Sequence, residues 1–192
     1  MRALLTDTGV FSQSYRPSSL ARLGFSPQEV AAISPGIVYV SLSAYGYTGP
    51  WAERRGFDSL VQTATGFNRA EGQAAGIDGP KELPAQILDH CTGYLMAFGT
   101  IVAQARQLRE GGSWHVRVSL AQTARWLWSL GRIDNGLATT DLKADAVADL
   151  MDDMPSGFGP LRAVRHAAQM SQTPARWDRP AEPLGSQPPQ WP

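Results

Sequence analysis

Asp89 is the residue of this sequence whose type and position could most directly do chemistry. It is a lone carboxylate just ahead of a long apolar run, Cys91 to Ala105, which predicts a helix. A carboxylate at a helix N-terminus faces unpaired backbone N–H groups and the positive end of the helix dipole, which keep it ionised and oriented. That environment suits a nucleophile. Asp is also among the commonest helix N-caps, so a purely structural cap is the alternative.

Other familiar kinds of site lack the residues that they need. The chain has three histidines, His90, His115 and His166, and one cysteine, Cys91, which is a poor supply of zinc ligands. Consecutive helical residues point about 100° apart, so His90 cannot readily activate the Cys91 thiol. The sequence contains no GxSxG, Walker A or GxGxxG motif. We therefore expect no metal site and no permanently bound cofactor.

Composition narrows the class of protein further. The chain has 192 residues, and its 17 basic and 17 acidic side chains give a formal net charge of zero, unlike the basic surface of a nucleic-acid-binding protein. The N-terminus lacks a sustained apolar signal core, and polar residues interrupt the longest apolar run before it reaches bilayer length. A single cysteine fits a reducing compartment. We expect a cytoplasmic protein that binds neither nucleic acid nor membrane.

Hydrophobic patterning in the first part of the chain predicts an α/β fold. Residues 10–15 alternate like a strand, and residues 18–24 predict a short helix closed by glycine. Ser26 and Pro27 begin a helix that should end near Ile33. Residues 37–43 form an almost continuous apolar run, as in a buried strand of a parallel sheet. The loop 44–51 would then lie at the carboxyl end of a strand, where ligands often bind.

The next segments continue the alternation of helices and strands. Residues 58–66 predict a helix, and the Gly- and Ala-rich residues 68–84 an irregular loop. The helix that begins near Asp89 should run to about Glu110, with apolar residues all around it, so we expect it to be buried against a sheet or a partner. Residues 114–118 alternate like a strand, and Ser119 should cap the helix that follows.

The character of the chain changes near residue 134, so we predict a core over residues 1–134 and an appendage over residues 135–192. Residues 141–153 are compatible with a short helix. Residues 155–192 contain eight of the fourteen prolines and cannot form many ladder hydrogen bonds. This tail is expected to wrap over a surface as irregular or polyproline II chain.

A series of short motifs, in order along the chain, resembles the family III CoA-transferases (the CaiB/BaiF type). This family includes formyl-CoA transferase, carnitine CoA-transferase and α-methylacyl-CoA racemase. Each motif alone is weakly specific. Their occurrence in the family order over roughly residues 5 to 130 is a strong signal. The matching segments are residues 14–17, 20–24, 34–46, 48–50, 56–58 with Gln62 and Gly66, 88–89 with Gly93, and 116–120.

The resemblance implies a Rossmann-like fold and a role for Asp89 as the catalytic aspartate. In the family mechanism this carboxylate attacks an acyl-CoA thioester, and an aspartyl-CoA thioester follows through a mixed anhydride. A small carboxylate then accepts the CoA. The chemistry needs acyl-CoA as a substrate but no metal or redox cofactor, and family members form interlocked homodimers.

Phe57 and Asp58 distinguish between reaction types within the family. Racemases of the family have a histidine at the position of Phe57, and phenylalanine has no proton to exchange, which disfavours racemisation. Asp58 matches an acidic position near the active site of formyl-CoA transferase and is a second catalytic candidate. A cap at the start of its own helix is the alternative for Asp58.

Five positions match the part of the family pattern that binds CoA. By the resemblance, Tyr15 and Leu23 would contact the adenine or pantetheine portion, and two arginines, Arg22 and Arg55, suit the phosphates. The fifth is Ser14, where family members usually have asparagine. All are taken from the motif alone: Ser14, Tyr15, Arg22, Leu23 and Arg55.

Family members are about twice as long as this chain and begin with further strand–helix units. We therefore expect a truncated or split member, and an isolated half would leave apolar surface exposed and favour a partner. Three functional alternatives stay open at this point. The chain is part of an active transferase, a non-catalytic remnant of the family or, less favoured because of Phe57, an isomerase like α-methylacyl-CoA racemase.

Overall fold

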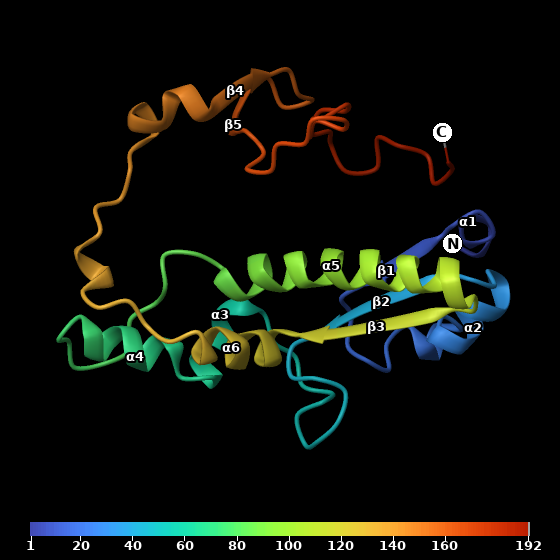
Figure 1. The fold of residues 1–192 in the computed structure, drawn as a ribbon, viewed down its shortest axis with the longest axis horizontal. Coiled ribbons are helices and arrows are strands. Elements are labelled where there is room, and N and C mark those ends of the chain that lie inside the picture. The colour runs from blue at the N-terminus through green and yellow to red at the C-terminus, as the bar shows by residue number, and fades with distance from the viewer. Residues whose placement is uncertain (192) are drawn as a thin grey trace. The chain divides into compact units, whose positions relative to one another are not determined.

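The computed structural model describes residues 1–191, which form two compact units, Met1–Leu137 and Ala138–Pro192. Figure 1 shows the elements of both units. The first unit combines a parallel sheet with helices on both faces, as the sequence predicts for an α/β fold. No helix of the described residues combines the length and apolar character needed to span a membrane.

Three parallel strands form the sheet of the first unit, and all three are confirmed predictions. They are β1 (Val10–Gln13), β2 (Val38–Ser43) and β3 (Trp114–Ser119), in the spatial order β1-β2-β3. In the register, Gln13 pairs with Ser41, which pairs with Arg117. The carboxyl ends of the strands therefore meet at one edge of the sheet, and the chain leaves this edge in three loops or helices.

One face of the sheet is covered by α1 (Arg2–Leu5) and α2 (Pro27–Ile33). A cluster of buried apolar side chains fills this side: Leu5, Val30, Ile37 and Tyr39. The predicted start of α2 is confirmed, since the Ser26 hydroxyl accepts a hydrogen bond from the Glu29 N–H while the Glu29 side chain bonds back to the Ser26 N–H. This reciprocal capping box fixes where the helix begins.

The opposite face of the sheet is covered by α5 (Ile87–Glu110). Ala103 of this helix packs on Val38 and Val40 of the central strand. The helix approaches β3 most closely at Gly99, where an added Cβ would lie only 2.8 Å from Cγ1 of Val116. Glycine is thus required there by the close packing of helix on sheet.

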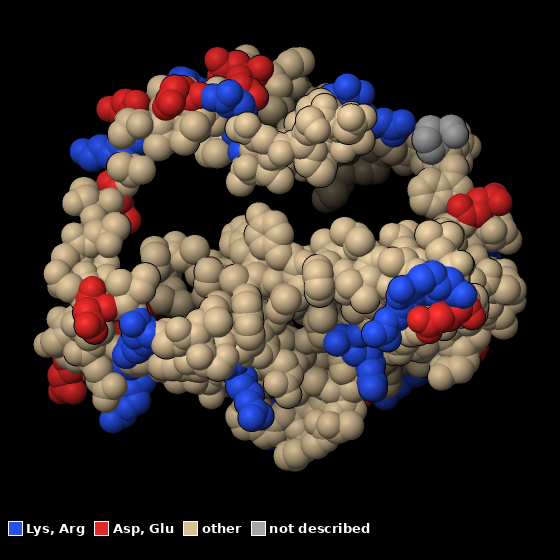
Figure 2. Space-filling model, viewed as in Figure 1, with Lys and Arg blue, Asp and Glu red and all other residues tan. Residues whose placement is uncertain are grey.

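The outer side of α5 differs from the prediction of a buried helix. Tyr94, Phe98 and Ile101 recur at helical spacing and are 74%, 67% and 65% exposed. Figure 2 shows the middle of α5 without a single Lys, Arg, Asp or Glu on the face in view. The helix is therefore buried on its sheet side only. The all-round apolar sequence reflects a second apolar face that the other elements of the first unit leave exposed.

Three helices pack together near the carboxyl edge of the sheet: α3 (Asp58–Ala64), α4 (Phe67–Ala74) and α6 (Leu120–Ser129). They share a core with the start of α5: Val61, Leu88, Leu120 and Ala124. Ser119 accepts a hydrogen bond from the Gln122 N–H and so caps α6, as predicted.

One local prediction in the first unit is wrong, and another is confirmed only in part. Residues 68–84 are not all irregular, because α4 covers the first part of them; Gly66 begins this helix in the left-handed region, and Gly72 allows the backbone oxygen of Gly79 to approach. The predicted helix over 18–24 is only the short 3-10 helix η1 (Ala21–Leu23), which Gly24 ends with a positive φ. The glycines among residues 68–84 suggested a loop where a helix forms. The glycine that closes the second segment did not indicate how short its helix is.

The second unit contains more regular structure than its proline content predicts. After η2 (Gly136–Ala138) at the junction come η3 (Ala144–Leu150), β4 (Met151–Met154) and β5 (Leu161–Val164). The two strands pair antiparallel, with Met151 opposite Val164. The predicted helix over 141–153 is thus a shorter 3-10 helix followed by a strand, and the tail is not wholly irregular.

Candidate functional site

Asp89 lies in the first turn of α5, beyond the carboxyl edge of the sheet. The helix begins at Ile87 and its N-cap is Gln86, so the prediction that Asp89 is the cap itself is wrong. Its side chain is exposed. As the third helical residue it lies where backbone N–H groups have no intrahelical acceptor and where the helix dipole favours negative charge.

Asp58 provides the missing acceptor for this helix end. Its side chain is only 1% exposed, and its Oδ2 accepts a hydrogen bond of 2.8 Å from the backbone N–H of Asp89. The other carboxylate oxygen, Oδ1, accepts a hydrogen bond from Nε2 of Gln62. Asp58 is the first residue of α3, whose N-cap is Phe57. The expected alternative was a cap for its own helix, but the backbone N–H that the side chain accepts from belongs to α5.

The environment of Asp89 favours the protonated form of its carboxyl group. Burial by the surrounding protein raises the pKa of Asp89 above its ordinary value of 3.8, even though the side chain reaches solvent, and the nearby charge of Asp58 raises the pKa further. His90 acts in the opposite direction. A carboxylate with a raised pKa is more basic, and in its ionised form it can attack an electrophile.

A second hydrogen bond holds the next turn of α5. The hydroxyl of Thr92 donates to the hydroxyl of Thr123 on α6 over 2.7 Å, and both side chains are buried. Thr123 in turn donates to the backbone oxygen of Ser119. The start of α5 is therefore tied to α3 through Asp58 in its first turn and to α6 through Thr92 in its second. Two independent contacts hold Asp89 at a defined position.

The five predicted CoA-binding residues lie on segments that leave the same edge of the sheet. Ser14 and Tyr15 follow β1, Arg22 and Leu23 lie in η1, and Arg55 precedes α3; all five are exposed. A hydrogen bond of 2.7 Å from Ser18 Oγ to Glu53 Oε2 links the loop after β1 to the loop before α3.

Arg55 lies in the loop before α3, three residues ahead of Asp58, the first residue of that helix. The Ser18–Glu53 and Asp58–Asp89 hydrogen bonds link the two loops, α3 and the start of α5. The roles of the individual residues within it stay predictions.

The structure gives contacts to Gln62, which the sequence offered only as a motif position, and adds two threonines that the sequence did not single out. Gln62 is 3% exposed and bonds to Asp58 and to the backbone oxygen of Ala85, and Thr92 and Thr123 form the buried pair described above. The spacing of Asp58 and Gln62 is a usable signal, because residues four apart on a helix are neighbours. The Thr92–Thr123 pair has no comparable signal, since 31 residues separate its members.

Among residues 1–191, no group of three or more His, Cys, Asp or Glu side chains is arranged to hold a metal ion. The Asp58 carboxylate accepts hydrogen bonds from a backbone N–H and from an amide.

These observations prompt comparison with known proteins. The family model described as CoA-transferase family III matches residues 1–146. The chain belongs to CoA-transferase family III. The match includes the whole sheet, both carboxylates and the helices around them, and it confirms the resemblance drawn from the sequence motifs.

Relatives with assigned names include several CoA-transferases. The acetyl-coenzyme A transferase nodX of Hypoxylon pulicicidum is 33% identical over 66% of this family III chain, and the acetyl-CoA:oxalate CoA-transferase of Acetobacter aceti is 34% identical over 61%. The succinyl-CoA:glutarate CoA-transferase of Mus musculus is 33% identical over 58%. These matches cover 22%, 30% and 25% of the respective relatives, so the chain spans well under half of their lengths.

Solved structures of the family share the fold. A variant of Rv3272 from Mycobacterium tuberculosis superimposes with a TM-score of 0.61 and 26% identity, over 68% of this chain and 36% of that one. A CAIB/BAIF family protein from Brucella suis gives a TM-score of 0.62 at 21% identity, over 83% of this chain and 43% of that one. The family fold is therefore present in this chain.

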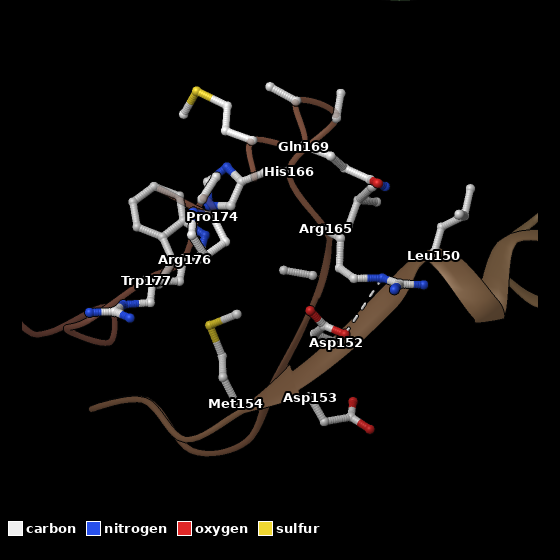
Figure 3. A pocket seen from close by; sticks show the side chains of 16 residues that line it. Leu150, Asp152, Asp153, Met154, Arg165, His166, Gln169, Pro174, Arg176 and Trp177 are labelled. Atoms are coloured by element: carbon white, nitrogen blue, oxygen red, sulfur yellow. Dashed lines mark ion pairs between the residues drawn. The ribbon is translucent and has the colours of Figure 1, made fainter. Parts of the chain in front are cut away.

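A cavity of about 1020 Å³ in the second unit is separate from the residues of the family site. It is lined by β4, β5 and the segment that includes His166 and Trp177, whose rings lie 5.0 Å apart (Figure 3). Its cations already have partners: Arg165 pairs with Asp152, and Arg176 pairs with Asp178. These ion pairs leave the cavity poorly suited to the phosphates of CoA.

Proposed function

We propose that this chain carries the catalytic carboxylate of an acyl-CoA:carboxylate CoA-transferase, and that Asp89 is the nucleophile. The observation that carries the proposal is the position of Asp89: an exposed carboxylate in the first turn of α5, with its backbone N–H bonded to the buried Asp58. Membership of the family and relatives named as CoA-transferases support the reaction class.

The proposed reaction balances without any cofactor. The Asp89 carboxylate attacks the thioester carbon, the C–S bond breaks, and a mixed anhydride and the CoA thiolate form. The thiolate then attacks the aspartyl carbonyl and the anhydride C–O bond breaks. The first carboxylate departs, and an aspartyl-CoA thioester remains on the protein. An acceptor carboxylate repeats these steps in reverse and regenerates Asp89. Covalent catalysis thus divides one difficult transfer into easier ones.

The surrounding residues have distinct proposed tasks. Asp58 holds the main chain of Asp89 in place, and the helix N-terminus stabilises negative charge that develops beside it. Tyr15, Leu23 and Ser14 would contact the apolar and polar portions of CoA. The two arginines, Arg22 and Arg55, would bind its phosphates.

Assembly and setting form part of the same proposal. We infer a homodimer, or association with further parts of the family fold, because the outer face of α5 presents exposed aromatic and aliphatic side chains. The single cysteine supports a reducing, cytoplasmic setting. The proposed substrates are an acyl-CoA and a small carboxylate, with no permanently bound cofactor.

The direct test is the covalent intermediate. Incubation of the protein with acetyl-CoA or succinyl-CoA is expected to add the mass of CoA less one water, on a peptide that contains Asp89, and hydroxylamine should release it. Asp89→Asn is expected to abolish the adduct, because an amide cannot attack the thioester, while Asp78→Asn, at an exposed acidic position, should retain it. Folded wild-type protein without an adduct would contradict the proposal.

A further inference from the structure

The Gln62 side chain connects the α3 carboxylate to the segment ahead of α5. Its Nε2 donates to Oδ1 of Asp58 and to the backbone oxygen of Ala85 over 3.1 Å. Both partners are acceptors, so only the NH₂ end of the amide can face them. The residue is 3% exposed, and its orientation is therefore fixed by contacts within the protein.

The contacts of Asp58 show why this amide matters. A carboxylate that is 1% exposed needs hydrogen-bond donors to replace water, and Asp58 has Gln62 at one oxygen and the Asp89 N–H at the other. Without the amide, Oδ1 would be left unpaired in the interior. The carboxylate would then rotate or draw in water, and its bond to Asp89 would weaken.

The second bond of Gln62 acts on the same segment. Ala85 lies two residues ahead of Ile87, and its oxygen also accepts a hydrogen bond of 2.9 Å from the Ile87 N–H. One amide therefore bonds to the turn that starts α5 and to the carboxylate that holds the main chain four residues later. Both contacts determine where the first turn of α5 lies.

We propose that Gln62 is a positioning residue for Asp89: it holds Asp58 and the Ala85 carbonyl and so fixes the main chain that carries the nucleophile. The inference deepens the proposed function and depends on it for its catalytic consequence. The geometric statement rests on the hydrogen bonds alone. Gln62 itself touches neither substrate nor reacting atoms in this scheme.

The test uses two substitutions of similar size. Gln62→Met keeps the length of the side chain but removes the donor, and Gln62→Glu replaces the donor with an acceptor that repels Asp58. Gln73→Met, on the exposed side of α4, is the matched control. Hydrogen exchange of the Asp89 amide, followed by NMR on the full chain, is expected to be about 10-fold faster in both Gln62 variants and unchanged in the control.

The rate of adduct formation is a second measurement. It would not change in the pattern given below if Gln62 had only a structural role. The maximal rate of CoA adduct formation should fall at least about 10-fold in the Gln62 variants, whereas the half-saturating acyl-CoA concentration should stay within about twofold, because Asp89 is displaced and the CoA-binding loops are not. Wild-type exchange at Asp89 in a folded Gln62 variant would overturn the proposal.

The two proposals fail in different ways. A wild-type protein that forms no adduct contradicts the role of Asp89 as nucleophile, but the amide exchange needs no turnover and still decides whether Gln62 holds the main chain. An adduct in the wild-type protein together with unchanged rates in both variants supports Asp89 as nucleophile and contradicts Gln62 as its positioning residue.

Discussion

The carboxyl group of Asp89 combines features that oppose each other energetically. The first turn of a helix favours its charge, but the surrounding protein and the Asp58 carboxylate raise its pKa above 3.8. The raised pKa means that the folded protein binds this proton more tightly than the unfolded chain does. The stabilisation is present at low pH and is lost as the pH rises through the folded-state pKa.

Replacement of Asp89 should therefore stabilise the protein at neutral pH. Asp89→Asn removes a charge that the folded state disfavours, so its melting temperature at pH 7 is expected to exceed that of the wild type. The difference should shrink towards pH 3, where the wild-type carboxyl is protonated. Circular dichroism melts at both pH values measure this, with Asp78→Asn as the control. A lower melting temperature for Asp89→Asn at pH 7 would mean that the helix dipole dominates instead.

At the scale of elements, the close packing of α5 on the sheet depends on the absence of a side chain at Gly99. A Cβ at Gly99 would lie 2.8 Å from Val116 Cγ1, whereas a Cβ at Gly93 on the same helix meets no atom within 4 Å. Val116 is a β-branched residue of the sheet and has little freedom to rotate away. Substitution of these two glycines therefore distinguishes the effect of close packing from that of intrinsic helix propensity.

This contrast gives a paired prediction. Gly93→Ala should raise the free energy of unfolding by about 0.5–1 kcal/mol, because alanine favours helix over glycine. Gly99→Ala gains the same propensity but forces α5 and Val116 apart, so we expect it to be less stable than Gly93→Ala by about 1–3 kcal/mol. Urea unfolding measures both. Equal free energies for the two variants would show that Val116 yields without cost.

Elements with strong periodicity were predictable from the sequence, and those that depend on tertiary contacts were not. The alternation in β3 and the apolar run of β2 fixed their strands, and Ser26 and Ser119 marked helix starts that the structure confirms. The helix α4 was missed because it is polar and Gly-rich and is held by contacts of its neighbours.

The hydrogen bond between Asp58 and Asp89 could not be inferred from spacing, because 31 residues separate the two. The order of the motifs identified both residues as candidates. The sequence patterns did not indicate which helix Asp58 caps. The helix that Asp58 caps is determined by how α3 and α5 pack, and local sequence patterns do not predict this packing.

At the scale of the whole molecule, the clusters of buried apolar residues belong to the first unit. All three clusters of buried apolar residues lie within Met1–Leu137, and the family match ends at residue 146. The division of the chain into a core over 1–134 and an appendage over 135–192 remains our proposal for its domains.

Truncation tests that proposal. A chain that ends at Leu137 retains every residue of the three clusters, so its melting temperature is expected to lie within about 3 °C of the full chain, a change of no more than about 1 kcal/mol. The comparison uses circular dichroism at equal protein concentration. A truncated chain that is unfolded, or that melts far below the full chain, would contradict an independent first unit.

The exposed side chains on the outer face of α5 affect how such experiments are read. Tyr94, Phe98 and Ile101 present aromatic and aliphatic surface to water in the native chain. Fluorescent dyes that report unfolding do so by binding apolar surface, and a folded chain whose outer α5 face has no partner already offers a binding stripe. A dye-based melt of the unassociated chain should start bright and change little on heating, which makes circular dichroism or tryptophan emission the appropriate signal.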